Sequence, residues 1–267
     1  MKLQVLQKTK VLVRYQCHND KIHFGFVEDD NILQLSSSFT EIANDVVQYD
    51  GRSVKYKDVK ILEPISPSKI VNFGWTYTQH AEETGGRTNL KEPFLFLKPT
   101  SCTIPDQGEV ILPPTDLTRQ VEMEGEVALV IGKPCKNVKE EEALDYIFGC
   151  TIFNDVTARD LTQSDPQFTR GKSFDTFGPL GPCIVKGLDP TDLQIVTKLN
   201  GDIVQRGNTN EMSFSIPFLI SWISRVMTLE PGDILALGSP SGSCPMKSGD
   251  VVEVEVDGIG KLCSYIK

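Results

Sequence analysis

The acidic residues that precede one hydrophobic segment are the part of this sequence best suited to chemistry. Glu122, Glu124 and Glu126 alternate with small or apolar residues and lead directly into the apolar run 127–131. Side chains two residues apart in a strand point to the same face, so this pattern places three like charges side by side. Such crowding is unfavourable unless a cation or solvent compensates it. The pattern therefore indicates either a solvated edge strand or a divalent-metal site.

A further acid favours the metal interpretation. Asp155 follows the apolar segment 150–153, where a charged residue at the end of a buried strand is unusual. Hard divalent cations prefer carboxylate oxygens in octahedral geometry, with positions left for water or substrate. Glu124, Glu126 and Asp155 could supply three such ligands. Spacing alone leaves the solvated acidic edge open as the alternative.

One histidine has an acid at helical spacing. His80 and Glu83 lie three residues apart in the predicted helix 78–84, so they share one face of it. A histidine held by a glutamate is a common general base for water, although an incidental surface pair has the same spacing. His18 and His23 lie near the N-terminus with no acid at useful spacing. His80 is therefore the candidate base.

Two glycine-rich segments carry further polar groups. The segment 170–182 is dense in Gly, Pro and charge, but it lacks the phosphate-binding pattern G-x-x-x-x-G-K-[ST]. Lys172 within it could receive a carboxylate, or it could be a surface lysine of a structured loop. The segment 238–242 does not match a nucleophile elbow in register, which argues against a serine hydrolase.

Short strands must position most of these residues. Strands are expected at 11–15, 22–27, 70–74, 94–97, 150–153, 234–237 and 251–256, with a hairpin at Asn200-Gly201. Helices are expected at 41–49, 78–84, 140–147 and 216–227. Strands outnumber helices and strict βαβα alternation is missing, so the fold class is α+β with a β-rich core. Two prolines in 62–68 indicate a connector between a small N-terminal domain, 1–62, and a larger domain, 63–267.

Size and composition narrow the function classes. The 267 residues can bury a large core, and the net charge of −9 argues against nucleic acid as a partner. The apolar runs are too short to span a bilayer, and residues 1–10 lack the apolar core of a signal peptide. The seven scattered cysteines contain no C-x-x-C, which favours reduced thiols and a cytoplasmic protein. The acidic charge and the lack of a basic amphipathic helix argue against a membrane partner.

Eight segments, taken in order, resemble the fumarylacetoacetate hydrolase family. They extend from about residue 70 to residue 266 and comprise 74–77 with His80 and Glu83, 96–99, 124–132, 154–160, 171–177, 179–182, 229–233 and 249–250. Each segment alone is modest evidence, but their shared order is specific. The resemblance implies a mixed β-roll core with a small N-terminal domain, and a homodimer.

The resemblance also assigns roles to individual residues. It implies that Mg²⁺, or Mn²⁺ or Ca²⁺ in its place, is bound by Glu124, Glu126 and Asp155. His80 and Glu83 match a water-activating pair carried on a lid, and Lys172 matches a catalytic lysine. The same comparison assigns substrate contacts to Lys98, Arg159, Tyr77 and Ser239.

Three positions depart from the common family pattern. Thr76 stands where many members have Asn, and Thr162 stands where many have Gln, with Gln163 one residue further on. Ser239 replaces the threonine of a common Gly-Thr-Pro and keeps a hydroxyl. The first two departures bear on substrate orientation rather than on metal binding.

The reaction implied is metal-dependent cleavage of a C–C bond in a small acylpyruvate, giving pyruvate and a carboxylic acid. The metal would stabilise an enolate, His80 would deprotonate water, and Lys172 would hold charge developing on the distal oxygen. The partner would be a 2-oxo dicarboxylic or acylpyruvic acid. Oxaloacetate decarboxylation, 2-oxo-alkenoate hydration or isomerisation, and a non-catalytic binding role remain alternatives, because one such site supports several reactions.

Overall fold

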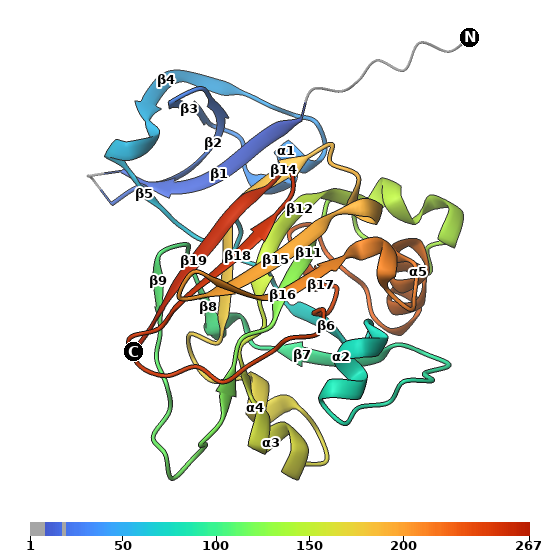
Figure 1. The fold of residues 1–267 in the computed structure, drawn as a ribbon. Helices are drawn as coiled ribbons and strands as arrows, with labels where there is room; N and C mark the ends of the chain where they lie inside the picture. Colours follow the sequence, from blue (N-terminus) through green and yellow to red (C-terminus); the bar gives the residue numbers. More distant parts are fainter. Residues whose placement is uncertain (1–8, 18–19) are drawn as a thin grey trace.

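The computed structural model describes residues 9–17 and 20–267, and two large sheets dominate it (Figure 1). His18 and residues 1–8 lie outside the described part. The 12-stranded sheet contains β1 (Lys10–Gln16), β2 (Ile22–Glu28), β3 (Asn31–Leu35), β4 (Tyr49–Lys55), β5 (Lys60–Ile61), β6 (Ile70–Gly74), β7 (Phe94–Lys98), β8 (Thr103–Ile104), β11 (Gly125–Ile131), β12 (Ile147–Asn154), β14 (Gly178–Lys186) and β17 (Ile234–Ala236).

The remaining elements lie around this sheet. A 5-stranded sheet contains β9 (Gly108–Val110), β15 (Gln194–Leu199), β16 (Asp202–Asn208), β18 (Val251–Val256) and β19 (Gly260–Ile266), and β10 (Val121–Glu122) pairs with β13 (Thr157–Ala158). The α-helices are α1 (Phe39–Ala43), α2 (Thr78–Glu83), α3 (Arg159–Ser164), α4 (Thr169–Lys172) and α5 (Ile216–Val226). Short 3₁₀ helices span Tyr56–Asp58, Thr100–Cys102, Glu140–Tyr146, Pro190–Asp192 and Thr209–Glu211.

The order of the large sheet, β4-β3-β2-β1-β14-β12-β11-β17-β6-β7, joins distant parts of the sequence. The N-terminal strands continue the sheet because β1 pairs antiparallel with β14, with Leu12 opposite Ile184. The predicted N-terminal domain thus shares its sheet with the rest of the chain, and the boundary after residue 62 stays a prediction. Among the described residues, no helix is long and apolar enough to cross a membrane.

The central strand β11 is buried on both faces. Val127, Leu129 and Ile131 belong to one apolar cluster, whereas Ala128 and Val130 belong to another on the opposite face. The first face is covered by the small sheet, whose strands β15, β18 and β19 pack across β11, β12 and β14. From Val127 to Ile131 the strand is apolar at every position for this reason, as expected where both faces are covered.

The pairing of β11 with β12 positions the acidic residues. Gly125 lies opposite Asn154 in the antiparallel register, and the Asp155 amide donates to the Glu124 carbonyl oxygen over 2.8 Å. The start of one strand and the end of the next therefore meet at the same end of the sheet. Residues about 30 positions apart in sequence become neighbours there.

Several expected elements are confirmed, and several need correction. The strand at 70–74 and the hairpin at Asn200-Gly201 form as predicted. The segment 140–147 forms a 3₁₀ helix, not an α-helix, and the expected helix at 41–49 is the shorter α1, which begins earlier because Ser38 caps it. The apolar run 94–97 favours a buried strand, but β7 is the edge of the sheet and Leu97 is 44% exposed.

Glu122 also departs from the expected pattern. It belongs to β10, and the chain leaves the strand at Met123 and Glu124 before β11 begins. The three glutamates consequently do not share one strand face, and Glu122 is separate from the cluster formed by Glu124, Glu126 and Asp155. The alternative of a solvated acidic edge is wrong because all of these side chains are buried.

Candidate metal centre and active site

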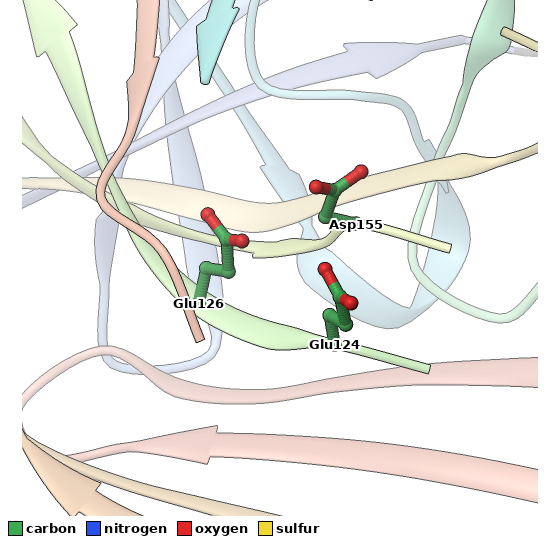
Figure 2. A group of neighbouring side chains, drawn as sticks. All are labelled: Glu124, Glu126 and Asp155. Carbon is green, nitrogen blue, oxygen red and sulfur yellow. The ribbon is translucent and has the colours of Figure 1, made fainter. Parts of the chain in front are cut away.

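Three carboxylates gather at the junction of β11 and β12 (Figure 2). Glu124, Glu126 and Asp155 each offer one oxygen, and these oxygens lie within 4.8 Å of one another. The residues are 4%, 2% and 0% exposed, respectively. Three acids in so little water are unfavourable without positive charge nearby. We call these residues the acid triad.

Two buried lysines supply part of that charge. Lys172, at the end of α4, donates to Glu124 over 2.7 Å and to Asp155 over 2.5 Å. Lys98, at the end of β7, donates to the other oxygen of Asp155 over 2.6 Å. Burial lowers the pKa of Lys172, but the carboxylates of Asp155 and Glu124 outweigh that effect and raise it overall. The lysine is therefore a charged group here.

Arg159, at the start of α3, supplies a third positive charge and balances the negative charge of Glu122 and Glu124. Its guanidinium donates to Glu122 over 2.8 Å and also to Glu124. Burial raises the pKa of Glu124, yet Lys172, Arg159 and His80 together hold it well below its usual value. Glu122 additionally accepts from Gln120 over 2.6 Å and from Ser243 over 3.1 Å. Glu122 thus orients Arg159 at the edge of the triad.

Glu126 differs from its neighbours because no described cation forms an ion pair with it. Its carboxylate accepts a hydrogen bond from the Gly238 amide over 2.9 Å. Burial and the nearby charge of Asp155 raise its pKa well above the usual value. A group of buried oxygens that lacks one positive charge fits a hard divalent cation. The donor set of the triad is accordingly suitable for such an ion.

His80 lies between the triad and Glu83. Its Nε2 is 3.6 Å from a Glu124 oxygen, and its Nδ1 is 3.4 Å from a Glu83 oxygen. Burial lowers the pKa of His80, but hydrogen bonds with Glu124 and Glu83 raise it overall. Glu83 also accepts from the Gly242 amide over 2.9 Å, which fixes helix α2 against the loop after β17. The predicted pair on α2 therefore exists and faces the triad.

A cavity of only about 10 Å³ opens onto these groups. The triad, His80, Lys172, Arg159 and Ser239 line it together with Phe73, Gly74, Trp75, Phe96, Phe168 and Gly238. Two predicted substrate contacts do not line it. Lys98 is buried behind Asp155, and Tyr77 lines a different cavity beside Arg206 and Glu211, where its hydroxyl has no partner among the described residues.

The three departures from the family pattern have structural partners. Thr76 donates to the Leu237 carbonyl oxygen over 2.7 Å, and Thr162 donates to the Arg159 carbonyl oxygen over 3.0 Å. Ser239 accepts from Gln205 over 2.8 Å. The first two hydroxyls bond to backbone, so they support the loops around the cavity. Neither Thr76 nor Thr162 is among the residues that line the triad cavity.

Sequence reasoning missed the aromatic wall of the cavity. Trp75 and Phe168 come from segments 93 positions apart in the numbering, and their rings meet at 5.5 Å. Trp75 also adopts a positive φ of 58°, which is rare for a bulky residue. The sequence signal that could have indicated an aromatic wall is Trp75, which directly follows the glycine that ends strand β6. The spacing alone does not indicate which side chains it meets.

Comparison with known proteins identifies the family. A profile described as fumarylacetoacetate (FAA) hydrolase C-terminal matches residues 69–267, and one described as Rv2993c-like, N-terminal matches residues 12–64. A relative from Bacillus subtilis (strain 168), named oxaloacetate tautomerase YisK, is 41% identical over 222 residues, covering 78% of this chain and 73% of the relative.

Solved structures give the same result. A protein described as 5-carboxymethyl-2-hydroxymuconate delta-isomerase from Mycobacterium smegmatis is 36% identical, with a TM-score of 0.88 over 96% of this chain and 98% of that chain. A maleylpyruvate hydrolase from Sphingobium sp. SYK-6, solved with manganese(II) and pyruvate, is 28% identical, with a TM-score of 0.78 over the same shares. The expected β-rich α+β fold is confirmed, and the chain belongs to the fumarylacetoacetate hydrolase family.

Proposed function

We propose that this chain hydrolyses a C–C bond in a small acylpyruvate, releasing pyruvate and a carboxylic acid. The observation that carries the proposal is the His80–Glu83 pair directed at a buried triad of acids. A hydrolase needs a base for water, and the pair provides one beside the group that would hold the 2-oxo acid. The Sphingobium relative, described with manganese and pyruvate, supports the same chemistry.

Glu124, Glu126 and Asp155 would hold a divalent cation, Mg²⁺ or Mn²⁺ being the expected ions. Such a cation acts as a Lewis acid that stabilises negative charge on a substrate oxygen. Lys98 fixes the orientation of Asp155 through its 2.6 Å contact, and Arg159 does the same for Glu124. These partners hold the carboxylates in place before substrate arrives.

The chain's own side chains would perform the proton transfers. His80 Nε2 would accept a proton from water, and the Glu83 carboxylate would stabilise the resulting imidazolium through Nδ1. Glu83 would hold the imidazole in place for this transfer, since its carboxylate lies 3.4 Å from Nδ1. Lys172, fully buried and charged, would stabilise negative charge on the distal oxygen of the substrate.

A second candidate is enol–keto tautomerisation of oxaloacetate. It is favoured by the Bacillus subtilis relative, which carries that name at 41% identity. The same residues would serve, with His80 moving a proton to or from carbon 3 of the substrate instead of activating water. Hydrolysis consumes water and breaks a C–C bond, whereas tautomerisation does neither, so the products separate the two reactions.

The test measures pyruvate release from fumarylpyruvate and acetylpyruvate, and loss of enol absorbance from oxaloacetate, each with Mg²⁺ and with EDTA. The proposal expects Mg²⁺-dependent pyruvate release that falls in His80→Gln and persists in His23→Gln. Turnover of oxaloacetate enol without pyruvate release from either acylpyruvate would replace hydrolysis by tautomerisation. The homodimer and the cytoplasmic location expected from the sequence stay predictions.

A further inference from the structure

The cavity at the triad is too small to hold a whole acylpyruvate. Its volume is about 10 Å³, and most of its lining consists of charged and aromatic side chains. A second cavity of about 290 Å³ lies beside it, and Trp75, Arg159 and Phe168 line both. We call the second one the side cavity. These three shared residues open a way for the part of a substrate beyond the reacting carbons to extend into the side cavity.

One wall of the side cavity is aromatic. The rings of Trp75 and Phe94 lie 4.5 Å apart, and Phe168 lies 4.9 Å from Phe94. Phe168 is half-buried and comes just before α4, which carries Lys172. Flat apolar surfaces of this kind contact a carbon chain or a conjugated acyl group without specifying charge. The aromatic wall could therefore contact the carbon chain in the middle of a substrate, but it offers no charged partner for a polar group at the far end.

The lining of the side cavity also contains charged residues, and most are already paired. Arg159 contacts Glu122 and Glu124, and Asp165 accepts two hydrogen bonds from Arg170 over 2.7 and 2.5 Å. The guanidinium of Arg87 is exposed and forms no hydrogen bond or ion pair with any side chain or backbone group in the described part of the chain. Arg87 is the cation of this lining that remains available for a ligand.

Packing of the segment after α2, which contains Gly86 and Arg87, places Arg87 at the side cavity. The neighbouring Gly86 lies against the indole of Trp75, so close that a Cβ atom there would be 2.3 Å from the indole nitrogen. Trp75 itself has a positive φ of 58°, a conformation that a bulky residue adopts only when its surroundings impose it. The contact between Gly86 and Trp75 thus ties the segment after α2 to the aromatic wall.

We propose that the side cavity binds the acyl half of the substrate and that Arg87 receives a carboxylate at the end of this half. A guanidinium binds a carboxylate through two parallel hydrogen bonds, which gives both affinity and direction. The substrate class is then an acylpyruvate whose acyl group ends in a carboxylate. This inference rests on the proposed function and adds the specificity-determining residue to it.

The test compares fumarylpyruvate with its terminal monoamide, which has the same shape and no distal charge. Wild-type protein is expected to favour the acid over the amide by about 10- to 100-fold in kcat/KM, the range of one charge-assisted hydrogen-bond pair. Arg87→Gln should remove this preference by lowering kcat/KM for the acid alone. Lys91→Gln is the matched control, because Lys91 is exposed on the same segment but does not line the side cavity.

A binding measurement separates this inference from the proposed function. In a Trp222→Phe chain Trp75 is the remaining tryptophan, so its fluorescence reports occupancy of the side cavity. The probes are 2-oxoadipate, which has a distal carboxylate and no 4-oxo group to cleave, and 2-oxohexanoate, which lacks the distal carboxylate. Tighter binding of 2-oxoadipate that disappears in Arg87→Gln supports the inference.

Two results are distinguishable. Equal binding of the two probes, or a preference unchanged in Arg87→Gln, overturns the role of Arg87 even if pyruvate is released normally. An Arg87-dependent preference for 2-oxoadipate without pyruvate release from any acylpyruvate supports the carboxylate receptor and overturns hydrolysis as the reaction.

Discussion

The triad cavity and the side cavity differ in how their charges are satisfied. At the triad, buried Lys98, Lys172 and Arg159 are held on acidic partners by hydrogen bonds, and the acids are fixed to the paired strands β11 and β12. The side cavity has an aromatic wall and an exposed Arg87, on the segment after α2, that pairs with no residue in the described part of the chain. Rigid elements thus position the chemistry, whereas a connecting segment faces the variable part of the substrate.

The largest expected effect comes from breaking the triad. Glu126→Gln removes a carboxylate that pairs with no cation among the described residues, so the variant should lose Mn²⁺ affinity and pyruvate release by more than the roughly 100-fold typical of supporting partners. Glu122→Gln is the control, because Glu122 lies outside the triad and contacts Arg159. Calorimetric titration with Mn²⁺ measures both. Similar losses in the two variants would contradict the assignment of three ligands.

Removing the base should spare the metal. His80→Gln is expected to lower kcat for acylpyruvate hydrolysis by about 10²- to 10⁴-fold, the usual contribution of a general base. Mn²⁺ affinity should change little, since His80 does not belong to the triad. Stopped assays of pyruvate release provide the rate. An unchanged rate would show that water is activated elsewhere.

The support behind Asp155 can be tested by comparing two lysines, each of which pairs with a fully buried aspartate. Lys98→Met should weaken Mn²⁺ binding by about 10- to 100-fold, because Lys98 orients Asp155. It should also destabilise the fold, because Asp155 keeps Lys172 as its only described cation, at a cost below the about 3–5 kcal/mol of a fully uncompensated buried charge. Lys69→Met removes the partner of Asp233, another fully buried acid, at a distance from the triad.

Lys69→Met should therefore lower the melting temperature without altering Mn²⁺ affinity. Metal titration and thermal unfolding of both variants separate the two effects. If Lys98→Met loses stability but keeps full metal affinity, Lys98 has only a structural role.

The smallest expected effect lies in the side cavity. Gly86→Ala adds a Cβ atom that would lie 2.3 Å from the indole nitrogen of Trp75, so the segment after α2 must shift. We expect KM for fumarylpyruvate to rise several-fold, at roughly 1 kcal/mol, with kcat and Mn²⁺ affinity retained. Combining Gly86→Ala with Trp75→Ala removes the clash, so non-additive effects of the two changes would locate the contact. Strictly additive effects would argue against it.

The sequence predicted what depends on strand register and missed what depends on packing. The acids Glu124, Glu126 and Asp155 could be grouped because one antiparallel pairing brings them together. Glu122 was placed wrongly because alternation does not reveal where a strand is interrupted. The depth of Lys98, behind Asp155 instead of beside the cavity, and the contact of Gly86 with Trp75 depend on tertiary packing that no local pattern encodes.

The most direct test of the central claim is pyruvate release from fumarylpyruvate by metal-stripped protein, measured before and after Mn²⁺ is restored. We expect no release by the stripped protein, full recovery on addition of Mn²⁺, and no recovery in Asp155→Asn. Release that EDTA does not reduce, or that Asp155→Asn retains, would contradict the assignment of the acid triad as the metal centre of a 2-oxo acid enzyme.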